Sequence, residues 1–268
     1  MTEWHHRLSD AHLHVDLYPA ATRTAMLEQA WADGVEAIVA VSMDLASSKI
    51  NRELSLRYPG RILPVYGYHP EQVIPDRKAH AALLSWIRQR AADGERFAIG
   101  EVGLPYYKRT SAAAAGETLS LKPYIELLES FIGLAGELKR PIALHAVYED
   151  AETVCDLLEK HQVEKAHFHW FKGPPQTINR MMASGYYLSV TPDVAYEPEI
   201  QSLVTRYPLE LMMTETDGPW PFEGPYTGQA TCPGMTADVV RHIARLKGIG
   251  ETEAATRTRD NLRSFYGI

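Results

Sequence analysis

Short apolar segments alternate along the chain with longer segments whose apolar residues recur every three or four positions. A short run of β-branched and apolar residues followed by a helical period is typical of a strand followed by a helix. Such runs predict eight strands: Leu8–Val15, Val35–Ser42, Ile62–Tyr68, Phe97–Leu104, Pro141–Val147, Lys165–Phe171, Tyr186–Val190 and Leu209–Thr214.

Helical periods fill most of the segments between these strands. The clearest lies in Tyr124–Leu138, where leucines and Phe131 repeat on one helical face. Further periods predict helices over Thr22–Ala32, Ala79–Ala92, Ala151–His161, Met235–Lys247 and Thr252–Tyr266, the last with Thr252 as its N-cap. Pro105–Lys122 and Gly218–Gly234 are predicted to be long connections after the fourth and the eighth strand.

Eight strand–helix units of this length predict a (β/α)8 TIM barrel, formed as a single domain over residues 1–268. We expect a distortion near strands 7 and 8, whose sequence patterns are the weakest. A doubly wound open sheet is the competing fold, but Ser9-Asp10-Ala11-His12 stands where its glycine-rich first turn is expected. In a TIM barrel the loops that follow the strands build the active site, so both long connections would face the substrate.

Composition and charge narrow the functional classes. The chain is 45% hydrophobic and carries 27 Lys+Arg against 34 Asp+Glu, a net charge of −7. An acidic chain is a poor candidate for coating duplex DNA, which depends on phosphate neutralisation. Cys155 and Cys232 lie too far apart in sequence to suggest a disulfide framework, and no apolar run approaches the ~20 residues of a membrane helix. With no signal-peptide pattern at the start, we expect a cytoplasmic protein without a membrane partner.

The first strand carries the clearest chemical signal, Asp10-Ala11-His12-Leu13-His14. Side chains two positions apart on a strand point to the same side, so His12 and His14 share a face with Asp10. Two adjacent imidazoles at a strand end can chelate a metal ion. Taken alone, the pattern fits polar residues on an exposed edge strand equally well.

Ligand-type residues also stand at the ends of four other predicted strands: Glu101, His145, His169 and Asp217. A closed barrel brings the ends of its strands together, so these residues would converge on His12 and His14. Buried charged groups are costly unless they are paired or bound to metal. The combined pattern therefore predicts a metal centre.

Seven motifs in chain order carry a family resemblance. They are His12-Leu13-His14, Gly67-Tyr68-His69-Pro70, Gly100-Glu101-Val102-Gly103-Leu104, His145, His169-Trp170-Phe171, Glu215-Thr216-Asp217-Gly218-Pro219 and Asn261-Leu262-Arg263-Ser264-Phe265-Tyr266-Gly267. Over nearly the whole chain the sequence resembles the TatD-type metal-dependent hydrolases of the amidohydrolase-like superfamily. Members of that family are described as deoxyribonucleases or broader phosphoester hydrolases.

The resemblance implies a role for each candidate. His12 and His14 would hold one divalent ion together with Asp217, His145 and His169 would hold a second, and Glu101 would bridge the two. A water shared by the ions would be the nucleophile. Asp217 would take its proton and His69 would contact the oxyanion of the substrate, which makes Glu101, Asp217 and His69 the expected catalytic residues. Zinc, manganese and magnesium all suit such ligands.

Two departures from the family pattern bear on the substrate. Pro105 stands where the family commonly has an aspartate, and Val147 stands where it commonly has an arginine. An arginine there would clamp a phosphate. Lys108, Lys172 or Arg109 could replace it from the loops, or they could be ordinary surface cations.

Several other side chains are expected near the barrel mouth or interior. Tyr106 and Tyr107 could stack on a base or ring of the substrate, or be ordinary rim residues, and Trp170 and Trp220 carry the same two interpretations. We expect His167, which faces the same way as His169, to be a packed interior residue.

The sequence thus favours a hydrolase acting on ester bonds through a hydroxide that bridges two metal ions. Its expected substrate is a phosphoester, either a nucleic-acid end or a small phosphodiester. Because the arginine is missing, a metal-dependent amide, lactone or carboxylic ester hydrolase is the first alternative. A non-catalytic barrel that binds a ligand is the second.

Overall fold

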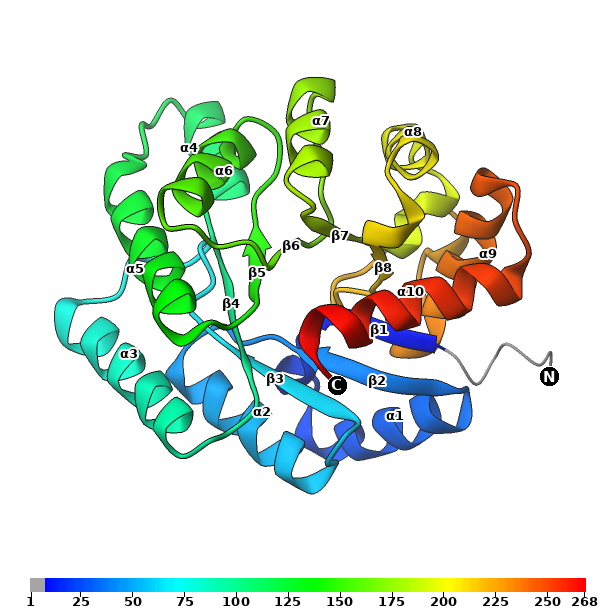
Figure 1. The fold of residues 1–268 in the computed structure, drawn as a ribbon, viewed down its shortest axis with the longest axis horizontal. Coiled ribbons are helices and arrows are strands. Elements are labelled where there is room, and N and C mark those ends of the chain that lie inside the picture. Colours follow the sequence, from blue (N-terminus) through cyan, green and yellow to red (C-terminus); the bar gives the residue numbers. More distant parts are fainter. Residues whose placement is uncertain (1–7) are drawn as a thin grey trace.

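Eight parallel strands form one sheet in chain order and curve into a ring surrounded by helices (Figure 1). The computed structural model describes residues 8–268. The expectation that the chain starts without a signal peptide concerns residues 1–7, which lie outside this range. The strands are β1 Leu8–Leu13, β2 Val35–Ala40, β3 Ile62–Tyr66, β4 Ala98–Gly103, β5 Ile142–His145, β6 Ala166–Phe168, β7 Tyr187–Val190 and β8 Met212–Thr214. The predicted (β/α)8 TIM barrel is confirmed.

Ten α-helices are present in the described residues. They are α1 Ala20–Ala32, α2 Leu45–Arg57, α3 Arg77–Ala92, α4 Tyr106–Ala114, α5 Lys122–Leu138, α6 Asp150–Lys160, α7 Pro175–Ala183, α8 Pro198–Arg206, α9 Thr236–Lys247 and α10 Glu251–Tyr266. None of them combines the length and apolar character that a bilayer crossing requires, within residues 8–268.

Three details of the predicted elements are wrong. Leu209–Leu211, predicted as the start of the eighth strand, forms a 3-10 helix before β8. The connection predicted over Pro105–Lys122 contains helix α4, which buries none of its residues and therefore shows no apolar period in the sequence. Thr252 does not cap α10, because the helix begins at Glu251, and Gly250 takes the N-cap position and accepts the N–H of Ala254.

The barrel is irregular at one seam. β7 and β8 pair in regular register, from Leu188 opposite Met212 to Val190 opposite Thr214. In the described residues β8 and β1 form no ladder; instead the loop after β8 reaches across to β1. The N–H of Asp217 donates to the carbonyl of His12 at 2.9 Å, and the N–H of His14 donates to the carbonyl of Gly218 at 3.0 Å. The distortion expected around the last strands thus lies between β8 and β1, and it adjoins three candidate ligands.

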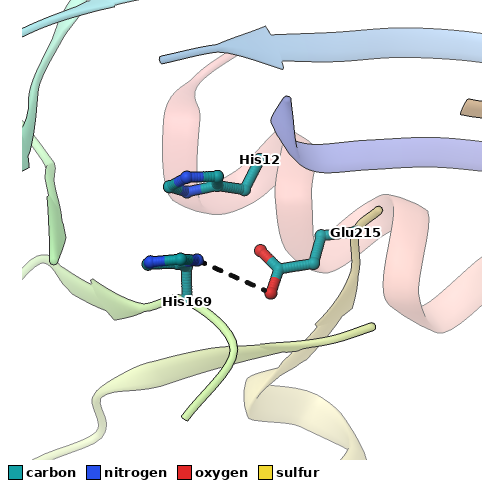
Figure 2. Close-up of side chains that lie close together, drawn as sticks. All are labelled: His12, His169 and Glu215. Atoms are coloured by element: carbon teal, nitrogen blue, oxygen red, sulfur yellow. Dashed lines mark ion pairs between the residues drawn. The ribbon is translucent and has the colours of Figure 1, made fainter. Parts of the chain in front are cut away.

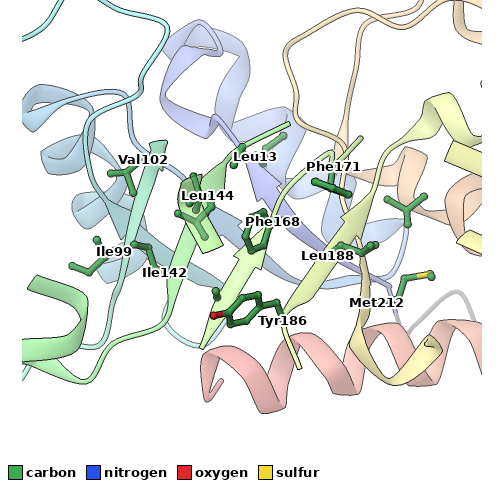
Figure 3. Close-up of a cluster of buried hydrophobic side chains, with 14 of the residues drawn as sticks. Leu13, Ile99, Val102, Ile142, Leu144, Phe168, Phe171, Tyr186, Leu188 and Met212 are labelled. Atoms are coloured by element: carbon green, nitrogen blue, oxygen red, sulfur yellow. The ribbon is translucent and has the colours of Figure 1, made fainter. Parts of the chain in front are cut away.

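Two apolar layers hold the barrel in place. The outer layer packs strand side chains such as Ile142, Leu144 and Phe168 against the surrounding helices (Figure 3). The inner layer fills the barrel with small and β-branched residues and includes Leu262, Phe265 and Tyr266 of α10. Helix α10 packs against β1 and β8 and so covers the seam. This arrangement leaves the opposite end of the strands free for the polar cluster.

Candidate metal centre

The ends of five strands bring the predicted ligands into one buried cluster. His12 lies in β1 and His14 follows it, Glu101 lies in β4, and His145 ends β5. His169 and Asp217 follow β6 and β8. All six side chains are buried, and Glu101 is completely enclosed. Residues as far apart in sequence as His12 and Asp217 thus converge because parallel strands end at the same face of the barrel.

Glu101 lies at the centre of the cluster and divides it into two groups. Its Oε2 is 3.0 Å from Nε2 of His12 and 3.2 Å from Nε2 of His14. Its Oε1 is 3.0 Å from Nδ1 of His145 and 2.8 Å from Nε2 of His169. Each oxygen of one carboxylate therefore faces a different pair of imidazoles, which is the geometry a bridging ligand requires.

Asp217 completes the first group. Its Oδ1 lies 3.5 Å from Nε2 of both His12 and His14. The sets His12–His14–Asp217 and Glu101–His145–His169 each bring their ligand atoms within 4.8 Å of one another. A third set adds Glu215, whose Oε1 lies 3.9 Å from Nδ1 of His169 below the stacked ring of His12 (Figure 2).

The donor set fits divalent cations. Buried polar atoms normally have hydrogen-bond partners, yet Nε2 of His14 and Oδ1 of Asp217 have none among the described residues. Nδ1 of His145 and Nε2 of His169 face each other at 3.1 Å. Imidazole and carboxylate groups with their lone pairs turned to a common centre suit zinc, manganese or related ions.

The pKa shifts of the carboxyl groups also favour a site for divalent cations. Burial alone would raise the pKa of Glu101, but the imidazoles of His69, His169 and His12 hold it well below its usual range. Burial, reinforced by the charge of Glu101, raises the pKa of Asp217 well above its usual range, although His145 opposes the shift. Two carboxylates this close cannot both carry charge at low cost without added positive charge between them.

His69 presents a hydrogen-bond donor to the cluster. Its Nδ1 accepts the backbone N–H of Glu71 at 3.2 Å, and its Nε2 lies 3.3 Å from Oε1 of Glu101. Burial lowers the pKa of His69 and favours the neutral ring. A neutral ring that accepts at Nδ1 carries its hydrogen on Nε2, so this hydrogen points into the site.

Glu71 lies in the site but was not predicted from the sequence. Its Oε1 lies 3.3 Å from Nε2 of His145, on the ring edge opposite Glu101. The same carboxylate accepts the backbone N–H groups of Tyr107 at 2.8 Å and Lys108 at 2.7 Å, at the start of α4. Burial would lower the pKa of His145, but its hydrogen bonds to Glu101 and Glu71 raise it to about 10. The available signal was a carboxylate directly after the Gly-Tyr-His-Pro motif.

Three residues predicted to contact the substrate, Tyr106, Lys108 and Lys172, each contact another residue of the protein. Tyr106 packs on Tyr148, with ring centroids 4.9 Å apart, and the ammonium of Lys108 donates to the carbonyl of Gln72 at 2.9 Å. Nζ of Lys172 lies 3.6 Å from a carboxylate oxygen of Asp193.

The tyrosine brought beside the cluster is Tyr107, whose ring centroid is 5.9 Å from that of His145. Trp170 is held by a hydrogen bond from its Nε1 to Asp193.

His167 takes part in a hydrogen-bonded chain in the barrel interior. Its Nδ1 lies 2.7 Å from the hydroxyl of Tyr266 and its Nε2 lies 2.5 Å from that of Ser189. Ser189 in turn donates to Glu215 at 2.6 Å, and the N–H of Trp170 donates to the other oxygen of Glu215. This chain links the carboxylate behind His169 to helix α10.

A TIM barrel that gathers imidazoles and carboxylates around one shared carboxylate belongs to the class of metal-dependent hydrolases. The family model for TatD related DNase matches residues 9–267, and the chain is a member of this family.

Relatives support the assignment along the full length. An uncharacterized metal-dependent hydrolase of Haemophilus influenzae is 33% identical over 261 residues, covering 97% of this chain and 100% of the relative. The human deoxyribonuclease TATDN3 is 30% identical over 266 residues, covering 97% of this chain and 94% of the relative. The crystal structure of the Escherichia coli TatD homolog YjjV matches in fold with a TM-score of 0.82 at 22% identity, covering 98% of both chains.

Proposed function

We propose that this chain hydrolyses phosphoester bonds with two divalent ions, one held by His12, His14 and Asp217 and one by His145 and His169, with Glu101 between them. The observation that supports this most directly is the division of Glu101, with one oxygen facing each pair of imidazoles. Two ions held there would supply the positive charge that activates a water molecule and stabilises the charge developing on the ester.

The side chains around the ions would position the substrate and move its protons. Asp217 would accept a proton from the attacking water, because its carboxylate lies beside His12 and His14, at the edge of the first group of ligands. His69 would donate its Nε2 hydrogen to an ester oxygen, as its contact with the backbone N–H of Glu71 favours this tautomer. Both roles need the reacting group to lie between these side chains and Glu101.

Carbonyl esters, lactones and amides are the second candidate class. Val147 is buried two residues after His145 and leaves that position without a cation to clamp a phosphate. The same activated water can attack a carbonyl carbon, and the fold accommodates either reaction.

A substrate panel tests the proposal. The protein is stripped with a chelator, reloaded with Zn²⁺, Mn²⁺ or Mg²⁺, and assayed on a chromogenic phosphodiester, single-stranded DNA, an aryl acetate and a lactone. We expect phosphodiester turnover that chelation abolishes. Asp217→Asn and His12→Ala should each lower kcat/KM by at least about 100-fold, the scale of a lost general base.

His161→Ala is the matched control, since this imidazole pairs with Glu129 on the outer surface. It should leave turnover unchanged. A preference for the acetate or lactone at equal metal loading would favour the second candidate. Full activity in both Asp217→Asn and His12→Ala would refute the metal-based mechanism.

A further inference from the structure

Two half-exposed aromatic rings each lie beside a histidine of the candidate metal centre. Tyr107, at the start of α4, is 44% exposed and its ring centroid lies 5.9 Å from that of His145. Trp220, in the loop after β8, is 43% exposed and its ring centroid lies 6.4 Å from that of His14. Each ring meets a histidine of a different group edge to face. A molecule reacting at the cluster would therefore lie within reach of both.

Hydrogen bonds fix the backbone of both aromatic residues. The carboxylate of Glu71 accepts the N–H of Tyr107 at 2.8 Å. The N–H of Trp220 donates to the carbonyl of Asp217 at 3.3 Å, and its carbonyl accepts the hydroxyl of Thr231 at 2.5 Å. Rigid aromatic side chains give contact area at a low cost in conformational entropy.

In the segments that join each strand to the next helix, acidic residues far outnumber basic ones. In the described residues, the segments that join each strand to the next helix contain one cation, Lys172. The same segments contain the acids Asp16, Asp44, Glu71, Asp76, Glu149, Asp193, Glu197, Glu215, Asp217 and Glu223.

Two cations at the mouth, Lys172 and Arg109, are paired with acids. Lys172 lies beside Asp193, and Arg109 in α4 binds Asp150 at 2.8 Å and Glu149 at 2.9 Å. Lys108 donates to a backbone carbonyl.

Proteins that bind single strands combine stacking rings with a positively charged groove that follows the phosphates. This mouth has the rings, but its strand-to-helix segments contribute one cation and many acids, which outside the metal centre would repel a polyanion. We propose that the site takes a small ester with one anionic centre and a planar aromatic group, recognised by Tyr107 and Trp220, in preference to a nucleic-acid strand. This inference rests on the proposed hydrolase function and names its substrate class.

Salt dependence separates a small ester from a strand. The metal-loaded protein is assayed on thymidine 5′-(4-nitrophenyl) phosphate and on a short oligothymidylate from about 50 to 300 mM salt. A strand held through Z phosphates gives a slope near −0.7Z in log affinity against log salt. We expect a higher kcat/KM for the small ester, with nearly no salt dependence.

A binding pair that does not react tests the two rings directly. Calorimetric titration compares phenylphosphonate with methylphosphonate, which share the anionic group and differ in the ring. The wild-type protein should bind phenylphosphonate about five- to tenfold more tightly, the scale of one aromatic contact. Tyr107→Ala and Trp220→Ala should each reduce this difference and the double variant should abolish it, whereas Tyr107→Phe and Trp220→Phe should retain it.

Leu56→Ala serves as the control, because this exposed leucine lies on α2, outside the mouth. Equal affinity for both phosphonates, or a preferred oligothymidylate with a steep salt slope, would overturn this inference and leave the hydrolase function standing. Hydrolysis of no ester with any metal would instead refute the proposed function, and the phosphonate titrations would still decide the role of the rings.

Discussion

At the scale of single residues, the candidate centre depends on carboxylates that each make several contacts. Glu101 faces four imidazoles of the cluster, and Glu71 joins the outer edge of His145 to two backbone N–H groups of α4. A carboxylate on the far nitrogen of a metal-binding histidine fixes the ring orientation and increases its basicity. We therefore regard Glu71 as a positioning residue for both His145 and Tyr107.

Replacing Glu71 tests this role through metal affinity. Glu71→Ala should weaken metal binding by about 10- to 100-fold, the usual effect of losing such a partner. The metal affinity of Glu71→Gln should fall between those of the wild-type protein and Glu71→Ala, because the glutamine amide oxygen still accepts a backbone N–H but carries no charge. Competition with a chromophoric chelator measures the affinity without any substrate. Glu126→Ala, at an exposed glutamate on α5, is the control, and unchanged affinity in Glu71→Ala would contradict the role.

The convergence of the candidate ligands could be predicted because each one stands at a strand end, where the chain pattern and the barrel topology agree. The same reasoning could not identify Glu71 and Tyr107 as residues of the site. Glu71 follows a short strand by several positions, and its partners His145 and Tyr107 are distant in sequence. Similarly, nothing in the pair Tyr106-Tyr107 tells which ring turns to the cluster and which packs on Tyr148.

At the scale of elements, the strands were predicted well because buried parallel strands are continuous apolar runs. Helices with a long apolar face such as α5 were predicted, whereas α4, which buries none of its residues, was missed. Helices α2, α7 and α8 were not predicted either, although α7 and α8 each bury apolar residues. The close approach of β4 and β5 is another property that the apolar pattern does not show. Gly103 pairs with His145 there, and a Cβ on Gly103 would overlap the carbonyl oxygen of His145.

Gly103→Ala should therefore destabilise the barrel and displace His145. The clash is with backbone, which can yield only by breaking the β4–β5 pairing, so we expect a loss of about 2–3 kcal/mol in the free energy of unfolding. Urea denaturation measures it. Gly133→Ala, inside α5, is the matched control, since its Cβ would make only ordinary contact with the ring of His161. It should be neutral or stabilising by up to about 1 kcal/mol, and equal stability of both variants would contradict the close approach.

At the scale of the whole molecule, the two ends of the barrel hold different kinds of side chain. One end is filled by apolar residues and by α10, and the other end holds buried imidazoles and carboxylates. The β8–β1 seam is joined at this polar end by the loop that carries Asp217, whose N–H meets the carbonyl of His12. Ions bound there would thus link strands on both sides of the seam as well as offset the buried negative charge.

Removing the metal should therefore lower the stability of the entire barrel. A ligand that binds only the folded state at about a thousand times its Kd stabilises it by about 4 kcal/mol. In a chain of this length that is roughly 8–16 °C in Tm, at ~2–4 °C per kcal/mol. Scanning calorimetry with and without chelator measures the shift, and adding Mn²⁺ or Zn²⁺ back should restore it. His12→Ala should show a much smaller response, because it lacks a ligand at the seam. An equal Tm for loaded and stripped wild-type protein would mean that the ions, if bound, do not hold the seam together.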